Sequence, residues 1–170
     1  MNDRPSADET ASWQRRLAIQ ANDRAWALSE TPFRSPEEDE EMLQAAHAAM
    51  HFWNIVGSAR NRAHAAQLVA HACALLGLGN PAKHYLAKAR PFFGGEGVEP
   101  WELALAHAIA ANVAAAVGDV AAHRSHHADA TRLVAALADP ADRDILNATL
   151  TVIPRPHEAE NEPIENRRLK

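Results

Sequence analysis

The sequence predicts an all-α protein in which about seven helices pack as antiparallel hairpins. Alanine is the commonest residue and aromatic residues make up only 5% of the chain, a composition that favours closely packed helices over a sheet. Apolar residues recur at spacings of three and four along most of the chain, which is the period of an amphipathic helix. Glycine, proline and serine separate these periodic segments, and no segment has the alternating pattern of a strand.

The length of 170 residues fits one compact domain. We expect residues 6–156 to form this domain, because they contain all of the periodic segments. The flanking residues 1–5 and 157–170 contain too few apolar residues to offset the entropy of ordering. We therefore expect a disordered N-terminus and a disordered charged tail.

The charge and the cysteine content limit the partner and the compartment. The formal net charge is −5, which argues against nucleic acid and membrane lipid as partners, because both attract basic surfaces. No apolar run approaches the ~18–20 residues of a membrane span, and the N-terminus lacks the apolar run of a signal peptide. The single cysteine, Cys73, cannot form an internal disulfide. These features predict a cytoplasmic protein.

Two capping boxes predict where the first two helices begin. Ser6 and Glu9 have the S-x-x-E spacing, in which each side chain bonds the backbone N–H of the other residue. Ser35 and Glu38 repeat this spacing, with a proline in the first turn. The acidic residues 37–41 lie at the positive end of the helix dipole, so their charge has a structural explanation and we assign it no function. We expect these helices over residues 6–29 and 35–56.

Glycine and proline divide the rest of the chain into five more helices. Gly77 and Gly118 each end a helix, because glycine takes the left-handed conformation of a helix C-terminus without the cost that a Cβ imposes. Prolines stand in the first turn of three of the other helices. A glycine-rich loop interrupts the series at residues 94–97. We expect the five helices over residues 59–76, 81–90, 100–117, 119–137 and 140–151.

The third to sixth helices contain a weak internal repeat. Gly77 and Gly118 are 41 residues apart, and the same offset joins Leu76 to Val117 and Ala89 to Ala130. The first residue of each pair belongs to one helix–glycine–helix unit and the second residue to the next such unit. A fixed period of helical hairpins is typical of an α-solenoid.

At these residues the sequence resembles the tetratricopeptide repeat. Gly77 takes the glycine position ahead of the second helix of the repeat. Four further positions of the first copy fit the pattern: Ala70, Ala82, Leu86 and Ala89. In the second copy His107 and His123 replace a large apolar residue and an alanine, and the period exceeds the 34 residues of the family. The resemblance covers about half the chain and implies a right-handed α-solenoid, or a bundle, that holds a peptide or protein partner in a shallow groove.

A polar strip on the third helix is the candidate binding site. His64, Gln67 and His71 lie at positions i, i+3 and i+7, so they share one face of the helix. The 41-residue offset places Asn112 of the fifth helix beside His71. We expect these four residues to form a solvent-facing strip that offers hydrogen bonds to a peptide backbone or a neutral polar ligand. The alternative is an ordinary solvent-exposed face without a ligand.

Two histidine pairs support a second hypothesis, a His-rich helical bundle that binds a metal ion or a small molecule. His47 and His51 are four residues apart, as are His123 and His127, and this spacing directs both side chains of a pair to one side of a helix. The two pairs could hold a transition metal such as zinc between helices. The alternative is packed or solvated histidines. The sequence argues against a metalloprotease, because Ala48 stands where the motif H-E-x-x-H has its general base.

The sequence contains no catalytic motif. Cys73 would need a histidine base, and His71 points elsewhere on the same helix, so we expect a buried apolar cysteine. The loop at residues 94–97 follows no strand and lacks the Lys-Ser/Thr pair of a phosphate-binding loop. We therefore predict a non-enzymatic adaptor without a cofactor, whose partner is a protein or peptide, and leave homo-oligomerisation open.

Overall fold

The computed structural model describes residues 5–156, and within this range the chain forms seven helices and no strand. The predicted all-α fold is confirmed. The predictions of disorder for residues 1–5 and 157–170 fall outside the described residues, apart from Pro5. The helices are α1 (Ala7–Ser29), α2 (Pro36–Val56), α3 (Ala59–Leu75), α4 (Gly79–Phe93), α5 (Pro100–Ala116), α6 (Val120–Ala136) and α7 (Pro140–Val152).

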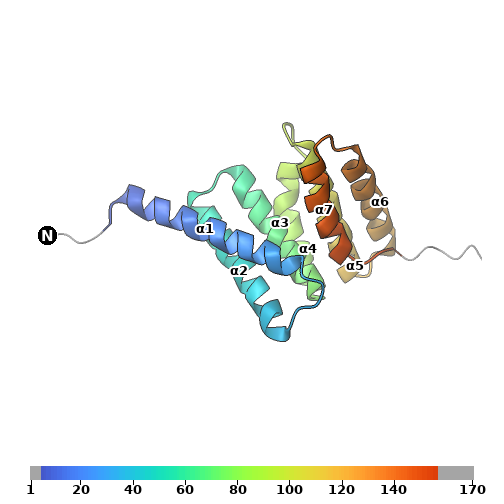
Figure 1. Ribbon diagram of the computed structural model, residues 1–170, viewed down its shortest axis with the longest axis horizontal. Coiled ribbons are helices and arrows are strands. Elements are labelled where there is room, and N and C mark those ends of the chain that lie inside the picture. Colours follow the sequence, from blue (N-terminus) through green and yellow to red (C-terminus); the bar gives the residue numbers. More distant parts are fainter. Residues whose placement is uncertain (1–4, 157–170) are drawn as a thin grey trace, which may run out of the picture.

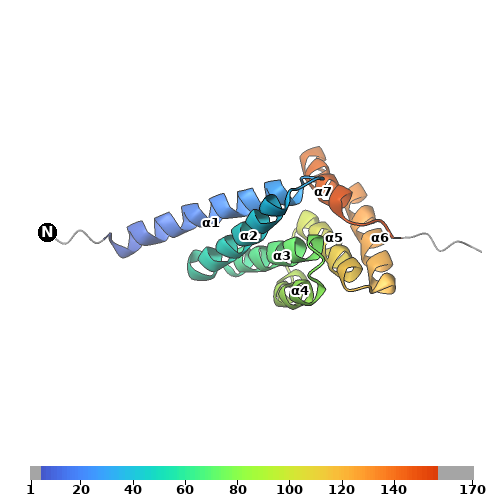
Figure 2. The ribbon, with the colours of Figure 1, turned by 90° about the horizontal axis from the view of Figure 1, so that it is seen from below.

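Successive helices pack as three hairpins, α1 with α2, α3 with α4 and α5 with α6. The hairpins follow one another along the long axis of the molecule, and α7 packs against α5 and α6 at the far end (Figure 1). The first turns of α1 extend beyond the other helices in both views (Figures 1 and 2). The expected antiparallel hairpins are therefore present, and no helix within residues 5–156 combines the length and hydropathy needed to cross a membrane.

The first two helices begin at the predicted capping boxes. Ser6 and Glu9 bond each other's backbone N–H, and so do Ser35 and Glu38, with Ser35 N donating to Glu38 Oε2 over 2.8 Å. Ser58 caps α3 in the same way, with an asparagine in the place of the glutamate. These helix N-termini agree with the prediction from the sequence, because each capping box involves only residues within one helical turn.

The two predicted glycine corners have the same geometry. Gly77 has φ 70° and Gly118 has φ 75°. The next backbone N–H in each corner reaches back to the helix, from Leu78 to the carbonyl of Cys73 over 2.8 Å and from Asp119 to that of Ala114 over 2.9 Å. This pattern is a Schellman motif in both corners. Residues 41 apart therefore occupy equivalent positions in the two corners.

The predicted bounds of α4 were too narrow. The helix begins at Gly79 rather than at residue 81, no side chain caps its N-terminus, and it continues through Pro91 to Phe93. Pro81 lies in the first turn, where the backbone N–H has no acceptor within the helix. The last turn persists because Phe93 is only 8% exposed and packs against alanines of α3. Tertiary burial here outweighs the local signal of the proline.

The core is built around α3, which packs against α1, α2, α4 and α5. Its buried residues run from Ala63 to Ala74 and occupy almost the whole circumference of the helix. Both α3 and α5 contain alanines with no exposed surface, and such small side chains let neighbouring helices approach closely. As a result, polar residues of α3 are enclosed together with apolar ones.

Candidate functional site

The predicted polar strip does not face solvent. Gln67, His71 and Asn112 are 1%, 0% and 2% exposed, and only His64 is partly accessible. The expectation of exposure was wrong because α3 is covered by four helices rather than presented on a concave surface. The role of these residues in ligand binding stays a prediction.

The prediction that Asn112 lies beside His71 is confirmed. Asn112 Nδ2 donates to His71 Nδ1 over 3.0 Å, which leaves the proton of the imidazole on Nε2. That Nε2 is buried and has no hydrogen-bond partner among residues 5–156. Burial, with a smaller effect of the Arg34 charge, lowers the pKa of His71 to about 3. The residue is therefore neutral at physiological pH and links the second and third hairpins.

At the exposed end of the strip, the side chains are held in place by the buried carboxylate of Glu102, which no sequence motif marks. Glu102 has no exposed side-chain surface and accepts hydrogen bonds from His64 Nε2 over 2.5 Å and Arg60 Nε over 2.7 Å. Its other oxygen accepts from the backbone N–H of Glu99 over 3.0 Å. Burial raises the pKa of Glu102, but the hydrogen bonds from Glu99, His64 and Arg60 outweigh it and lower this pKa below its ordinary value.

The same contacts orient an aromatic cluster. The His64 ring stacks on Trp101 with centroids 5.4 Å apart and planes 12° from parallel, and it meets the edge of Phe93 at 5.1 Å. The guanidinium carbon of Arg60 lies 5.9 Å from the centroid of a Trp101 ring. Because Glu102 holds both His64 and Arg60, it also determines how Trp101 is presented at the surface.

Trp101 forms one wall of a cavity of about 570 Å³ between α1, α3, α5 and α7, which we call the tryptophan groove. Its apolar floor and wall residues include Leu105 and Leu146 as well as the two tryptophans. The residues that bear on its chemistry are Trp26, Glu30, His64, Trp101, Asp142 and Ile145.

Two carboxylates of the tryptophan groove have no partner within the described part of the chain, residues 5–156. Neither Glu30, at the end of α1, nor Asp142, in the first turn of α7, forms a side-chain hydrogen bond or ion pair with residues 5–156. Burial raises the pKa of Glu30, because a charged carboxylate loses hydration at this position. Two unpaired carboxylates beside two indole rings form an environment suited to a cation.

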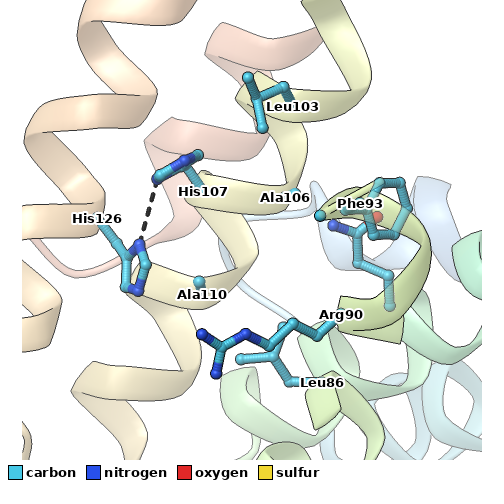
Figure 3. A pocket seen from close by; sticks show the side chains of 10 residues that line it. Leu86, Arg90, Phe93, Leu103, Ala106, His107, Ala110 and His126 are labelled. Carbon is cyan, nitrogen blue, oxygen red and sulfur yellow. Dashed lines mark hydrogen bonds between the residues drawn. The ribbon is translucent and has the colours of Figure 1, made fainter. Parts of the chain in front are cut away.

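A second cavity, of about 340 Å³, lies between α3, α4, α5 and α6, and we call it the arginine pocket (Figure 3). It is lined by Gln67, Leu86, Arg90, Phe93, His107 and His126, among others. The two histidines meet at their Nδ1 atoms over 3.2 Å. Both polar atoms of the Gln67 amide are buried without a hydrogen-bond partner among residues 5–156. The predicted strip is thus divided, with His64 in the groove and Gln67 in the pocket.

The candidate metal ligands are not brought together. His47 and His51 on α2 lie against the rings of Tyr85 and Phe52. On α6, His123 Nε2 bonds the carbonyl of Pro154 over 2.8 Å, and the His127 ring lies 6.1 Å from that of His123.

The two pairs lie apart, because α3 and α5 stand between α2 and α6 along the long axis (Figures 1 and 2). Within residues 5–156 there is no group of three or more histidine, cysteine or acidic residues arranged to hold a metal. Zinc sites in proteins use three or four protein ligands. The geometry therefore gives no support to the metal hypothesis.

Cys73 is buried, as predicted, with 2% of its surface exposed. Burial raises the pKa of the thiol, which keeps it protonated at neutral pH. The residue serves as a small apolar member of the core.

Comparison with known proteins finds no family model that matches the chain, no curated protein that matches it and no solved structure that matches it. A function is therefore inferred from the chemistry of the two cavities. Of these, the tryptophan groove is the larger and lies where one helix of each hairpin (α1, α3 and α5) meets the last helix, α7.

Proposed function

We propose that this protein is a non-enzymatic adaptor that binds a peptide segment of a protein partner in the tryptophan groove. The segment carries an arginine or lysine next to an apolar residue. The observation that carries the proposal is the presence of two unpaired carboxylates, Glu30 and Asp142, in one cavity with the indole rings of Trp26 and Trp101.

The carboxylates support a basic side chain as the occupant. A guanidinium or ammonium group between Glu30 and Asp142 would replace the hydration that each carboxylate has partly lost. The indole faces of Trp26 and Trp101 add a cation–π attraction, which is strongest for tryptophan. The net charge of −5 also favours the approach of a basic segment.

The apolar part of the groove supports a peptide rather than a simple cation. Ile145 is a large apolar residue with 61% of its surface exposed at the edge of the groove. Leu105 and Leu146 continue this surface inward. A cavity of about 570 Å³ is in the size range of sites that enclose several side chains or a small ligand. An apolar residue next to the basic one would cover Ile145.

The proposal is tested by selecting peptides from a random display library against the wild-type protein. We expect enrichment of sequences in which arginine or lysine adjoins an apolar residue. Fluorescence anisotropy of labelled peptides then measures affinity for the variant E30Q/D142N, which keeps the shape of both side chains and removes their charge. We expect the affinity to fall by about tenfold or more, as for the loss of a partly buried charge pair.

The matched control is E96Q/D144N, which removes the same charge from exposed positions outside the groove. It should bind the selected peptides like the wild type. Circular dichroism and thermal melting establish that both variants are folded. Enrichment of acidic peptides, or selected peptides that bind E30Q/D142N as tightly as the wild type, would contradict the proposal.

A further inference from the structure

The arginine pocket is chemically independent of the tryptophan groove. It is lined on α5 by Leu103 and His107, whereas the groove is lined by Trp101 and Leu105. Successive residues of an α-helix are 100° apart, so these two sets lie on opposite faces of α5. A ligand in one cavity would not contact a ligand in the other.

The first observation that points to a ligand is the Gln67 amide. The side chain is 1% exposed, and neither its oxygen nor its nitrogen has a hydrogen-bond partner among residues 5–156. Buried amides in proteins are normally paired, because an unpaired one loses its hydration without compensation. Gln67 lines the arginine pocket, so the missing donor and acceptor can be supplied from that cavity.

The second observation is the position of Arg90, an exposed residue whose side chain lines the pocket. This residue lies in the last turn of α4, and its guanidinium forms no hydrogen bond or ion pair with residues 5–156. Figure 3 shows the side chain extending from α4 toward Ala110 and His126 across the pocket. A guanidinium presents several N–H donors in one plane, which fits the two oxygens of a carboxylate.

The remaining walls define the polarity of the pocket. His107 and His126 are hydrogen-bonded to each other through their Nδ1 atoms, which are 3.2 Å apart. The carboxylate of Asp129 lies 3.7 Å from His107 Nδ1 and is already bonded to Arg132 over 3.0 Å. Phe93 forms an apolar wall on the side away from the histidines (Figure 3).

We propose that the arginine pocket binds a small organic carboxylate of the N-acyl amino acid type. The carboxylate pairs with Arg90, the amide group of the ligand accepts from and donates to the Gln67 amide, and an apolar side chain packs against Phe93. An amide satisfies Gln67 because it has both a donor and an acceptor, which a carboxylate alone does not.

The test uses N-acetyl-L-leucine as the probe, with two related compounds that each lack one group. N-acetyl-L-leucinamide lacks the carboxylate, and 4-methylpentanoate lacks the amide. Isothermal titration calorimetry at millimolar ligand is expected to show N-acetyl-L-leucine binding about tenfold or more tightly than either, as for the loss of one charged or buried hydrogen-bonded contact.

Two variants and one control assign the contacts. R90Q should weaken binding of N-acetyl-L-leucine by about tenfold or more, whereas K83Q, which removes the same charge from an exposed position on α4, should not change it. Q67L should abolish the preference for N-acetyl-L-leucine over 4-methylpentanoate. Q67L should also melt at the same temperature or higher, because it removes an unpaired buried amide.

Two results would overturn the inference. One is that N-acetyl-L-leucine does not bind the wild-type protein, or binds no more tightly than its amide. The other is that R90Q and K83Q bind it equally. Neither result depends on the peptide selection that tests the tryptophan groove, so the two proposals succeed or fail separately.

Discussion

At the scale of single residues, Glu102 shows how a residue in the first turn of a helix can fix the arrangement of side chains at the surface. Acidic residues are common in the first turn of a helix because they complement its dipole, and Glu102 fits that pattern in the sequence. Its carboxylate nevertheless has no exposed surface and bonds His64 and Arg60 of another hairpin. The sequence could not reveal this, because the bonds depend on how α5 packs against α3.

The variant Glu102→Ala should lose both stability and groove binding. His64 and the Glu99 N–H would lose their acceptor, whereas Arg60 is 46% exposed and can return to water. We expect the free energy of unfolding to fall by about 1–3 kcal/mol, the usual cost of leaving buried donors unpaired. Urea denaturation measures this change. Affinity for groove-binding peptides should also fall, since Trp101 loses its fixed neighbours. An unchanged denaturation midpoint would contradict this reading of Glu102.

His71 should make the protein less stable as the pH falls. The pKa of His71 is about 3 in the folded protein, against an ordinary value of 6.5. Between these two pH values the unfolded chain therefore binds a proton at His71 that the folded protein does not bind. The contribution of neutral His71 to the free energy of unfolding is fully present above about pH 6.5. It is lost as the pH falls toward 3, by about 1.4 kcal/mol per pH unit. Between pH 7 and 5 this amounts to about 2 kcal/mol.

The measurement is urea denaturation at pH 7 and pH 5. His71→Leu should be less stable than the wild type at pH 7, because Asn112 loses its partner, but its stability should change less between the two pH values. His84→Leu, on the exposed side of α4, is the matched control and should keep the difference of the wild type. Equal pH dependence in His71→Leu and the wild type would show that the imidazole is not neutral when folded.

At the scale of the elements, local patterns were predicted well and tertiary effects were not. The capping boxes of Ser6 and Ser35 depend on residues one turn away, and the corners at Gly77 and Gly118 depend on backbone conformation alone. Both can be recognised from the sequence. The last turn of α4 and the burial of Gln67 depend on which helices cover them, and no local pattern carries that information.

The two glycine corners should respond alike to substitution. Gly77 and Gly118 have φ values of 70° and 75°, and a Cβ at either would contact nothing within 4 Å. The cost of Gly77→Val or Gly118→Val is therefore backbone strain, about 1 kcal/mol or more for each. Thermal melting measures both, with Gly94→Ala as a control at a glycine that lacks a positive φ. If neither variant melted below the wild type, the shared corner geometry would be wrong.

Gly79 should be sensitive for a different reason. It opens α4 where the corner of the second hairpin meets the end of α5, and a Cβ there would lie 2.8 Å from the carbonyl oxygen of Ala116 and 2.9 Å from Val117 Cγ1. Backbone cannot move aside as a flexible side chain can, so the two hairpins must separate. We expect Gly79→Ala to cost about 1–3 kcal/mol, as overpacked contacts do. A melting temperature equal to that of the wild type would show that this contact is not close.

At the scale of the whole molecule, one core joins all three hairpins and the last helix. The largest cluster of buried residues extends from Ala25 on α1 to Leu146 on α7 and includes residues of every helix. A continuous core predicts a single cooperative unfolding transition. It also predicts that a fragment of residues 5–156 folds alone, because it contains the complete core.

This fragment should melt at the temperature of the full chain and with a van't Hoff enthalpy equal to the calorimetric one. Differential scanning calorimetry of both proteins makes the comparison. Two separate transitions would show that the hairpins unfold independently. A fragment that aggregates or melts at a clearly lower temperature would show that residues 1–4 or 157–170 contribute to the fold.

The hydrogen bond between His71 and Asn112 has a consequence for how the second and third hairpins are aligned. Both α3 and α5 carry fully buried alanines, whose small side chains give little preference for one alignment of the two helices over another. A slip of α5 by one residue along α3 would turn Asn112 away by 100° and leave polar atoms of both side chains unpaired in a dry interface. The alternative alignments lose this hydrogen bond while the observed one keeps it, much as a single buried asparagine selects one register in a coiled coil.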